Sequence, residues 1–405
     1  MAELKRIVGK TYIGLLVCLL VFNMLILVSD KTDDLQVTYA YIEMLNTAEG
    51  VKSDSKLSTE AATIAWQEYF QKYEINGSDS SDKTAAAKQA REKLMQQAKY
   101  IDNYKGIIED KRQTAILYAT AGTYKKNSFE YNNLLKTQYD LSQIIDADVQ
   151  LSNGLWLEKL YKNNYIHLLT LITCVYTVYM FFSERKNGLY HIVHTGQSGR
   201  GVLFVKRSII LLIQAVVTNV ALYTESAVML LNRYDGVKDL NVAAVSDEYF
   251  ILTSGKLSRI QFLGLIILLS ILANVVLSLV LWAILLCFGN VNIGLFFYCC
   301  ICVADVVIYK VISAKSILQI FKYLNVYYLF FPNKAAEYFN WGCFNIAVSL
   351  LTTTIIVSVF IGILALFASA YISIRKYFTG KMNIVENAIE LILTYIMRLM
   401  VKTNN

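Results

Sequence analysis

The residues best suited to recognising another molecule gather in one short basic segment, residues 183–207. Arg185, Lys186 and Arg200 supply strong hydrogen-bond donors for carboxylates and backbone carbonyls, and two glycines would bound a short helix between them. Such a compact, donor-rich element would fit a cleft on a soluble protein. The alternative is a basic stretch beside a membrane that contacts anionic lipid.

The order of residues in this segment resembles the corresponding loop in permease subunits of type-2 ABC exporters. In that family an acidic residue leaves a membrane span, a glycine follows, a short helix ends in Ser or Thr, and Gly-Arg and a lysine lead into the next span. The matching residues in order and spacing are Glu184, Gly188, Thr195, Gly199, Arg200 and Lys206. The resemblance implies that residues 187–199 form a coupling helix, flanked by Arg185 and Lys186, which contacts an ATPase subunit.

The resemblance covers the whole chain through its layout of spans, and it implies several partners. These are ABC ATPase subunits, which would bind ATP and Mg, a second permease subunit of the same or a different kind, and membrane lipid. It also implies a multi-pass location in a bacterial plasma membrane and outward movement of a peptide, lipid-like or drug substrate. The resemblance gives no reason to expect a cofactor in this chain.

The motifs of an ATPase or a hydrolase are missing from the sequence. A P-loop needs a glycine pair followed by Lys-Ser or Lys-Thr, but Gly196 and Gly201 are followed by Val202. His191 and His194 are three residues apart and could share a helix face, but no third ligand follows at a fitting spacing. We therefore expect no metal site and no catalysis in this chain, with ATP hydrolysed by a partner subunit.

A few polar residues interrupt the apolar runs. Asp305 and Glu225 are the ionisable ones, and a charged group at membrane depth is by default a functional candidate because its burial in hydrocarbon costs several kcal/mol. We therefore expect both to line a cavity, although Glu225 could instead reach interfacial water. Gln214, Asn219 and Asn274 are more typical of hydrogen bonds between helices.

Long apolar runs account for the composition of the chain, which has 405 residues, 56% hydrophobic and 17% charged. Each run has at least the roughly 18 residues that cross a bilayer. The runs lie in residues 1–29 (with the N-terminal flank), 165–182, 208–231, 261–288, 291–312 and 343–374. The chain contains one proline, which favours helices over broken segments. The sequence therefore predicts an all-α polytopic membrane protein with six transmembrane helices.

The first span is followed by a hydrophilic insert, residues 30–164, which we expect to be a helical extracytoplasmic domain. Residues 84–118 and 134–149 carry apolar side chains at three- and four-residue steps, which predicts two long antiparallel amphipathic helices. The insert contains no cysteine, so disulfides do not hold it. It could simply cap the membrane domain, or it could receive a substrate or partner, since its many tyrosines suit both roles.

Lysine and arginine in the short flanking segments predict the orientation. They are in excess before the first span, in residues 183–207 and in residues 375–405, so both termini and the loop should be cytoplasmic. Residues 232–260 balance basic with acidic side chains and should form an outer loop. The net charge of +7 is thus a signal of topology and not of nucleic-acid binding.

The two remaining segments complete the predicted layout. Residues 313–342 are rich in aromatic side chains and should form an outer re-entrant segment with a turn at Pro332. Residues 375–405 include an apolar face and should form an amphipathic surface helix. A non-transporting receptor or assembly factor that docks partners on the helical insert is the competing interpretation of the whole chain. The first apolar run lacks a small-residue cleavage site, which favours a retained anchor over a signal peptide.

Overall fold

The computed structural model describes most of the chain as helices. The described residues are 9–29, 35–51, 57–73, 81–183, 197–252, 255–288, 290–312, 322, 327–343 and 345–375. The remaining regular structure within these ranges is one two-stranded hairpin and three short 3-10 turns.

Five helices are long and apolar enough to cross a membrane. They are α2 (Lys10–Ser29), α11 (Gln197–Tyr234), α12 (Arg259–Cys287), α13 (Val291–Val311) and α17 (Leu350–Arg375). A sixth crossing results if α7 (Leu155–Lys162) and α8 (Tyr165–Phe181), which bend by 48° at a short break, count as one span. The prediction of an all-α protein with several helices apolar enough to cross a membrane is therefore confirmed, with five or six such spans where the sequence predicted six.

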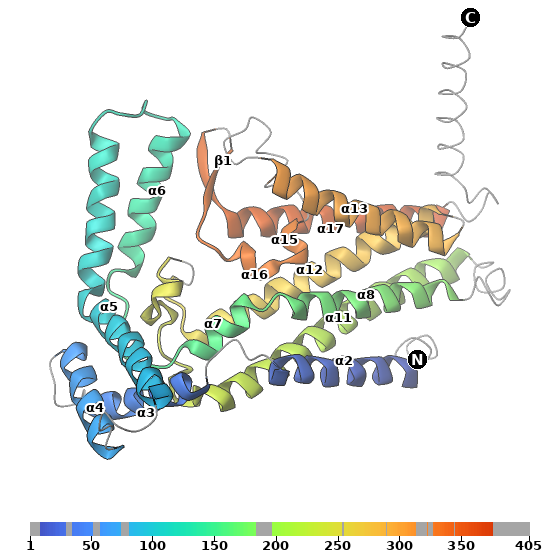
Figure 1. Ribbon diagram of the computed structural model, residues 1–405. Helices are drawn as coiled ribbons and strands as arrows, with labels where there is room; N and C mark the ends of the chain where they lie inside the picture. The colour runs from blue at the N-terminus through green and yellow to red at the C-terminus, as the bar shows by residue number, and fades with distance from the viewer. Residues whose placement is uncertain are drawn as a thin grey trace, which may run out of the picture.

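Helix α12 is the centre of the bundle. It packs against α8, α11, α13 and α17, while α2 packs on the far side of α11 and α8 (Figure 1). A capping box starts α12: the Ser258 hydroxyl accepts from the Gln261 amide, and the Gln261 side chain accepts from the Ser258 amide. Half of the most apolar stretch of α12 is buried, against about a tenth for α13.

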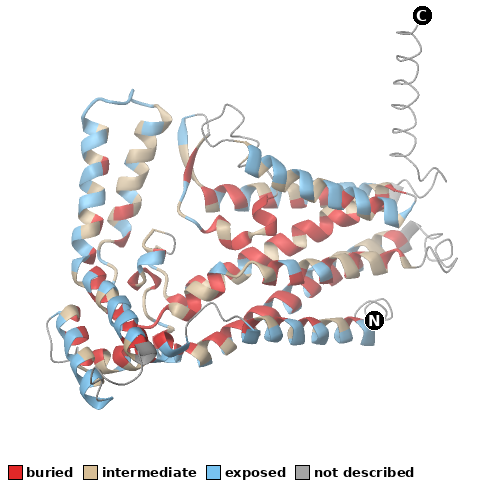
Figure 2. Ribbon diagram, in the orientation of Figure 1, coloured by how far each residue is buried: buried red, intermediate tan, exposed pale blue. Residues whose placement is uncertain are grey.

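The outer helices turn large apolar side chains away from the bundle. Phe296 on α13 and Phe360 and Phe367 on α17 are 61% to 70% exposed, and Figure 2 shows the same pale surface along α2 and α13. An exposed apolar surface of this extent is unfavourable in water and favourable in hydrocarbon. It is the surface that a bilayer would cover.

Among the described residues of the insert, four helices form a domain at one end of the bundle. They are α3 (Leu35–Val51), α4 (Ser58–Lys72), α5 (Ser81–Thr120) and α6 (Phe129–Ile144), and α5 and α6 lie side by side as a helical hairpin (Figure 1). The Ser128 side chain starts α6 by accepting from the Tyr131 amide at 3.3 Å. Tyr100 and Tyr104 are buried, whereas Tyr139 is 63% exposed, so the tyrosines serve both core and surface.

One hydrophobic core runs without interruption from the helical domain into the spans. It joins residues such as Met44 of α3 and Leu94 of α5 to Trp156 of α7 and Phe262 of α12. The Tyr100 hydroxyl also donates to the Val245 carbonyl, 2.7 Å away in the loop that precedes α12. The helical domain is therefore packed directly on the bundle.

Three boundaries differ from the sequence prediction. Helix α6 ends at Ile144, and the residues that follow are not helical, although the sequence predicted a helix through residue 149. Helix α11 begins at Gln197, so residues 197–207, which the sequence placed in a loop, are helical. The chain before α17 forms a hairpin, in which β1 (Asn340–Cys343) pairs with β2 (Ile346–Ser349), although the sixth span was expected to begin at residue 343. Asn345 has a φ of 66° at the turn, in the left-handed region that asparagine tolerates.

Two short helices lie within the expected re-entrant segment. Helix α15 (Tyr327–Phe330) ends directly before α16 (Pro332–Ala335), and Pro332 occupies the start of α16, where its missing amide hydrogen costs nothing. The Asn333 side chain donates to the Tyr161 carbonyl at 2.6 Å, which fastens this segment to α7. Most of residues 313–326 lies outside the described residues, as does the predicted amphipathic tail beyond Arg375.

The ends of the spans fall into two groups (Figure 1). Helix α2 begins, α8 ends, α11 begins and α17 ends at the end of the bundle opposite the helical domain. The helical domain, the loop between α11 and α12, and the β1–β2 hairpin lie at the other end. Helix α2 therefore begins, and helix α17 ends, at the same end of the bundle.

Candidate functional site

The segment that resembles a coupling loop connects α8 to α11 at the end of the bundle away from the helical domain. Its residues Glu184, Arg185, Lys186, Gly188 and Thr195 lie outside the described residues. Gly199 is in the first turn of α11, and Lys206 is exposed on the same helix.

Two arginines at the start of α11 are packed inward. Arg200 is 4% exposed and Arg207 is 5% exposed, and the Arg207 guanidinium lies 5.2 Å from the ring centroid of Phe181 on α8. A cation over an aromatic face stabilises such a buried contact. Arg200, which the sequence assigned to contact with an ATPase, is therefore buried in this conformation.

Glu225, one of the two candidate cavity residues, bridges two spans. Its carboxylate accepts a hydrogen bond from the Asn23 side chain of α2 at 2.7 Å, and Asn23 also donates to Ser226 at 2.9 Å. Asn23 is fully buried. The contact fastens α2 to α11, and Glu225 lines none of the cavities discussed below.

Asp305, the second candidate, is half-buried on α13. That helix packs against α12 and α15, so the structure does not bring Asp305 together with Glu225. Asp305 also lines none of the cavities discussed below. The two residues do not form a common site.

A seam of buried polar side chains runs between α8, α11 and α12. The Gln214 side-chain amide donates to the Thr173 hydroxyl at 2.7 Å, and the Asn274 side-chain amide donates to the Thr170 carbonyl at 3.5 Å. Both join helices, as the sequence suggested, whereas Asn219 donates to the Ala215 carbonyl of its own helix. Hydrogen bonds of this kind are worth about 1 kcal/mol each in a membrane.

His167 lies at the end of this seam nearest the helical domain. The Tyr223 hydroxyl is 3.2 Å from His167 Nδ1 and 3.0 Å from the Ser270 hydroxyl, so three helices meet at one polar group. A cavity of about 10 Å³ adjoins His167, Ser270 and Asn274, with Phe330 and Pro332 covering it. This volume holds about one water molecule, which is too little for a transported solute.

A buried ion pair holds the junction between the helical domain and the bundle. Arg259 is fully buried, and its guanidinium meets both oxygens of Asp247, with Nε 3.1 Å from Oδ2 and NH2 3.2 Å from Oδ1. The same guanidinium donates to the Ser152 hydroxyl at 2.8 Å and to the Asp239 carbonyl at 3.3 Å. One side chain thus joins α12 to two other segments. These are the linker after α6 (residues 145–154) and the loop after α11 (residues 235–258).

The electrostatics of this pair are set by burial. Burial raises the pKa of Asp247, and the charge and hydrogen bonds of Arg259 oppose that increase. The side chain of Asp247 is 13% exposed and that of Arg259 is 0% exposed. A bidentate, charge-assisted contact compensates part of the cost of removing both charges from water.

Two glycines allow the segments at the junction to approach one another closely. A Cβ atom on Gly154 would lie 1.8 Å from Asp247 Oδ2, and one on Gly236 would lie 2.4 Å from the buried Trp156 ring. The Asn153 amide donates to the Asp239 carboxylate at 2.7 Å, and its side chain donates to the Tyr234 carbonyl. The chain around the start of α7 and the chain after α11 therefore pack closely. At both contacts the backbone of a glycine lies against a side chain of the other segment.

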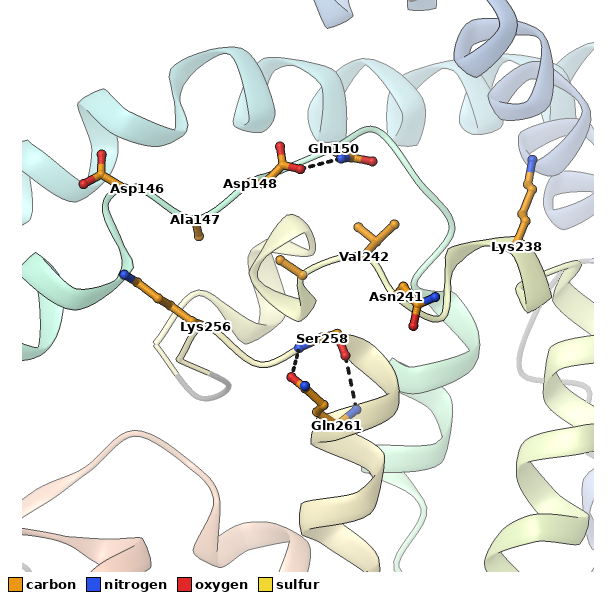
Figure 3. Close-up of a pocket in the computed structure, with 11 residues that line it drawn as sticks. Asp146, Ala147, Asp148, Gln150, Lys238, Asn241, Val242, Lys256, Ser258 and Gln261 are labelled. Atoms are coloured by element: carbon orange, nitrogen blue, oxygen red, sulfur yellow. Dashed lines mark hydrogen bonds between the residues drawn. The ribbon is translucent and has the colours of Figure 1, made fainter.

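A polar cavity of about 530 Å³ opens beside this junction (Figure 3). One wall is the linker after α6, and the other is the loop between α11 and α12 together with the first turn of α12. The lining residues are Asp146, Ala147, Asp148, Gln150, Lys238, Asn241, Val242, Ala243, Lys256, Ser258 and Gln261. Carboxylates stand on the linker wall and ammonium groups on the loop wall.

A second, mixed cavity of about 320 Å³ shares Lys256 with the polar cavity. It lies between α6, the loop before α12 and the chain from α16 to α17. Its apolar lining includes Leu252, Leu257, Leu265, Phe339 and Leu351. Together the two cavities extend across the junction on the helical-domain side.

The described residues contain no group of three His, Cys, Asp or Glu side chains placed to hold a metal ion. Comparison with family models, curated proteins and solved structures finds no match to this chain. The fold and these sites therefore define a membrane-embedded helical protein, and its family is not shown.

The sequence interpretation overlooked the junction and the His167 contact. Arg259 and Asp247 lie in residues 232–260, which the sequence assigned only to a charge-balanced outer loop, and His167 was assigned no role. Arg259 directly follows Ser258, whose capping-box partner is Gln261, so a helix start was detectable there. The partners of Arg259 and His167 come from distant parts of the chain, which local patterns do not report.

Proposed function

We propose that this chain is the transmembrane permease subunit of an ATP-driven ABC exporter. A separate nucleotide-binding subunit would hydrolyse ATP, and the chain would couple that hydrolysis to outward movement of a peptide, lipid-like or drug substrate. The proposal is supported by the residue pattern of segment 183–207 and by the position of its described flanks. These flanks, the end of α8 and the start of α11, lie at the end of the bundle opposite the helical domain (Figure 1).

The observation that carries the proposal is the continuity of α11. The helix runs for 38 residues from Gln197, within the basic segment, to Tyr234 at the junction. At 1.5 Å per residue it is about 57 Å long, which exceeds the bilayer core. It packs against α2, α8, α12 and α17 on the way. A displacement at its first turn would therefore reach both the polar seam and the junction.

In this proposal the basic segment faces the cytoplasm and contacts the ATPase, and the helical domain is extracytoplasmic. A second permease subunit completes the pathway, because the small cavity beside His167 holds only about one water. Export would require the polar seam to open at an interface between the two subunits.

Purification of the tagged chain from its native membranes tests the proposal. We expect a P-loop ATPase to co-purify and the complex to move a substrate only with ATP. The double variant Arg185→Glu/Lys186→Glu should weaken ATPase association at least about tenfold, since reversing charges across an interface costs about 2 kcal/mol or more. These residues are better targets than Arg200, whose burial means that Arg200→Glu would also disturb packing.

The matched control is Lys125→Glu/Lys126→Glu. It reverses a neighbouring pair of basic residues that is exposed on the turn between α5 and α6, far from the segment. This variant should retain the ATPase. If no ATPase co-purifies, or if both double variants export equally well, the exporter proposal is wrong.

A receptor or assembly factor that docks partners on the helical domain is the second candidate. The cavities beside the junction favour it, because they open on the helical-domain side of the bundle. It predicts a stable partner that binds equally well with and without ATP. The co-purification experiment separates the two.

A further inference from the structure

The polar and mixed cavities form a composite site that the coupling mechanism does not use. They adjoin at Lys256, which lines both. Their combined lining comes from the linker after α6, the loop before α12 and the chain near Phe339. The site therefore depends on the packing of the helical domain against the bundle.

The polar cavity offers charges of both signs. Asp146 and Asp148 are exposed on the linker wall, and Lys238 and Lys256 are on the loop wall (Figure 3). Lys238 is already bound to Glu49 at 2.5 Å. Among the described residues, Lys256 forms no ion pair, and Asp148 accepts only from the Gln150 side chain at 2.7 Å. Lys256 and Asp148 thus remain available to a ligand that carries both charges.

The linker wall has the pattern of an extended chain. Exposed and half-buried residues alternate from Asp146 to Gln150, outside any helix. The Gln150 amide donates to the Ser246 hydroxyl at 3.1 Å, which pins the linker to the loop. On the opposite wall, Ala243 and Ser258 form an antiparallel bridge. Walls of extended backbone suit a peptide, which can add its own amides and carbonyls.

The mixed cavity adds an apolar surface next to these charges. Phe339 is 39% exposed, and Leu252 and Leu257 are half-buried. The cavity also contains the Lys136–Asp140 ion pair, in which the two groups are 2.6 Å apart. Charged groups along the wall disfavour the binding of a lipid tail. An amphipathic peptide, in contrast, presents both apolar and charged side chains to such a wall.

We propose that the composite site binds an amphipathic peptide. Its charged residues would lie in the polar cavity, against Lys256 and Asp148, and its apolar residues would lie against Phe339 and Leu257 in the mixed cavity. This inference rests on the proposed function in one respect, because it names a peptide as the exported substrate. The binding itself requires neither ATP nor a partner subunit.

Binding of a fluorescein-labelled peptide of leucine, lysine and glutamate residues to the full chain in nanodiscs tests the proposal. A peptide with serine in place of every leucine is the first control, and empty nanodiscs give the background from lipid. We expect Lys256→Glu and Phe339→Ser each to weaken binding about tenfold, and the serine peptide to bind at least as weakly. Lys126→Glu, an exposed charge reversal on the α5–α6 turn, should bind as the unchanged protein does.

Equal binding by all variants would overturn the proposal, as would tighter binding of soluble glycerophosphoethanolamine, which would identify a lipid-headgroup site. Thermal unfolding of each variant shows whether its fold is retained, and both substituted side chains are exposed enough for this to be expected. Peptide binding without ATPase association would leave the site intact and refute the exporter. ATP-dependent export without peptide binding would support the exporter and refute the peptide site.

Discussion

Arg259 holds three segments together through a single guanidinium, so its replacement should destabilise the whole junction. It is fully buried, and its main partner Asp247 is itself 13% exposed. Removing one member of a buried pair leaves the other charge without compensation. The energetic consequence is therefore dominated by the uncompensated carboxylate of Asp247 and not by the absence of the hydrogen bonds themselves.

We predict that Arg259→Met lowers the free energy of unfolding by about 3 to 5 kcal/mol. The loss should be smaller at acid pH, because burial raises the pKa of Asp247 and the unpaired carboxyl can take up a proton. For a raised carboxyl pKa, the folded state is favoured at low pH, and that advantage disappears as pH rises through the folded value. Thermal unfolding in detergent at two pH values measures both effects.

The double variant Arg259→Met/Asp247→Leu should recover part of this loss, since it removes both charges of the pair. Lys238→Met is the matched control in the same loop. It breaks the more exposed Lys238–Glu49 pair and should cost less than about 1 kcal/mol. If Lys238→Met and Arg259→Met are equally destabilised, the junction does not depend on the buried pair.

At the scale of an element, the placement of α4 depends on one carboxylate of α5. Asp102 accepts from the amides of Ser58 and Thr59, at 2.7 and 2.9 Å, and from the Thr59 hydroxyl at 2.8 Å. These amides are free ends of the first turn of α4, whose own preceding residue, Leu57, provides no side-chain cap. A side chain from another helix therefore replaces the usual cap.

We predict that acid loosens α4 from α5. Burial raises the pKa of Asp102, but the hydrogen bonds from Thr59 and Ser58 more than offset this, so its pKa lies below the usual 3.8. The stabilisation is present above pH 3.8 and is lost as pH falls through the folded value. The protection factors of the α4 amides, which correct for the intrinsic slowing of exchange by acid, should therefore fall as the pH drops below 3.8.

Asp102→Asn should weaken the docking of α4 by about 2 kcal/mol at neutral pH and remove the additional response to acid. Glu60→Gln changes an exposed carboxylate on α4 itself and should leave that response in place. An unchanged acid response in Asp102→Asn would show that another group controls the docking of α4.

The spans and the α5–α6 hairpin could be predicted from sequence because both depend on patterns within one segment. Runs such as residues 261–288 are continuous, and α12 matches that run to within a few residues. The β1–β2 hairpin was missed because Trp341 to Ser349 merges into an apolar run and only the Asn345 turn interrupts it. The junction could not be predicted, since Ser152, Asp239 and Arg259 meet only after the domain has packed.

For the whole molecule, the separation of its two ends gives a direct test of orientation. Cysteine is absent from residues 30–164, so a single introduced thiol reports on the helical domain once the seven native cysteines are replaced. We predict that Lys125→Cys, exposed between α5 and α6, reacts with a membrane-impermeant maleimide in intact cells. Lys381→Cys, in the predicted cytoplasmic tail, should react only after lysis. The opposite pattern would invert the topology and remove the basis for the exporter proposal.

The shared core of helical domain and spans has a practical consequence for anyone who wishes to study residues 30–164 as a soluble fragment. Excision would separate Met44, Leu94 and Tyr100 from the members of their cluster that lie outside residues 30–164, such as Phe250 and Phe262. Newly wetted apolar area of this kind costs about 25 cal/mol for each Å² and promotes self-association. We expect the isolated fragment to precipitate or to melt without a sharp transition, whereas the intact protein should unfold this region together with its spans.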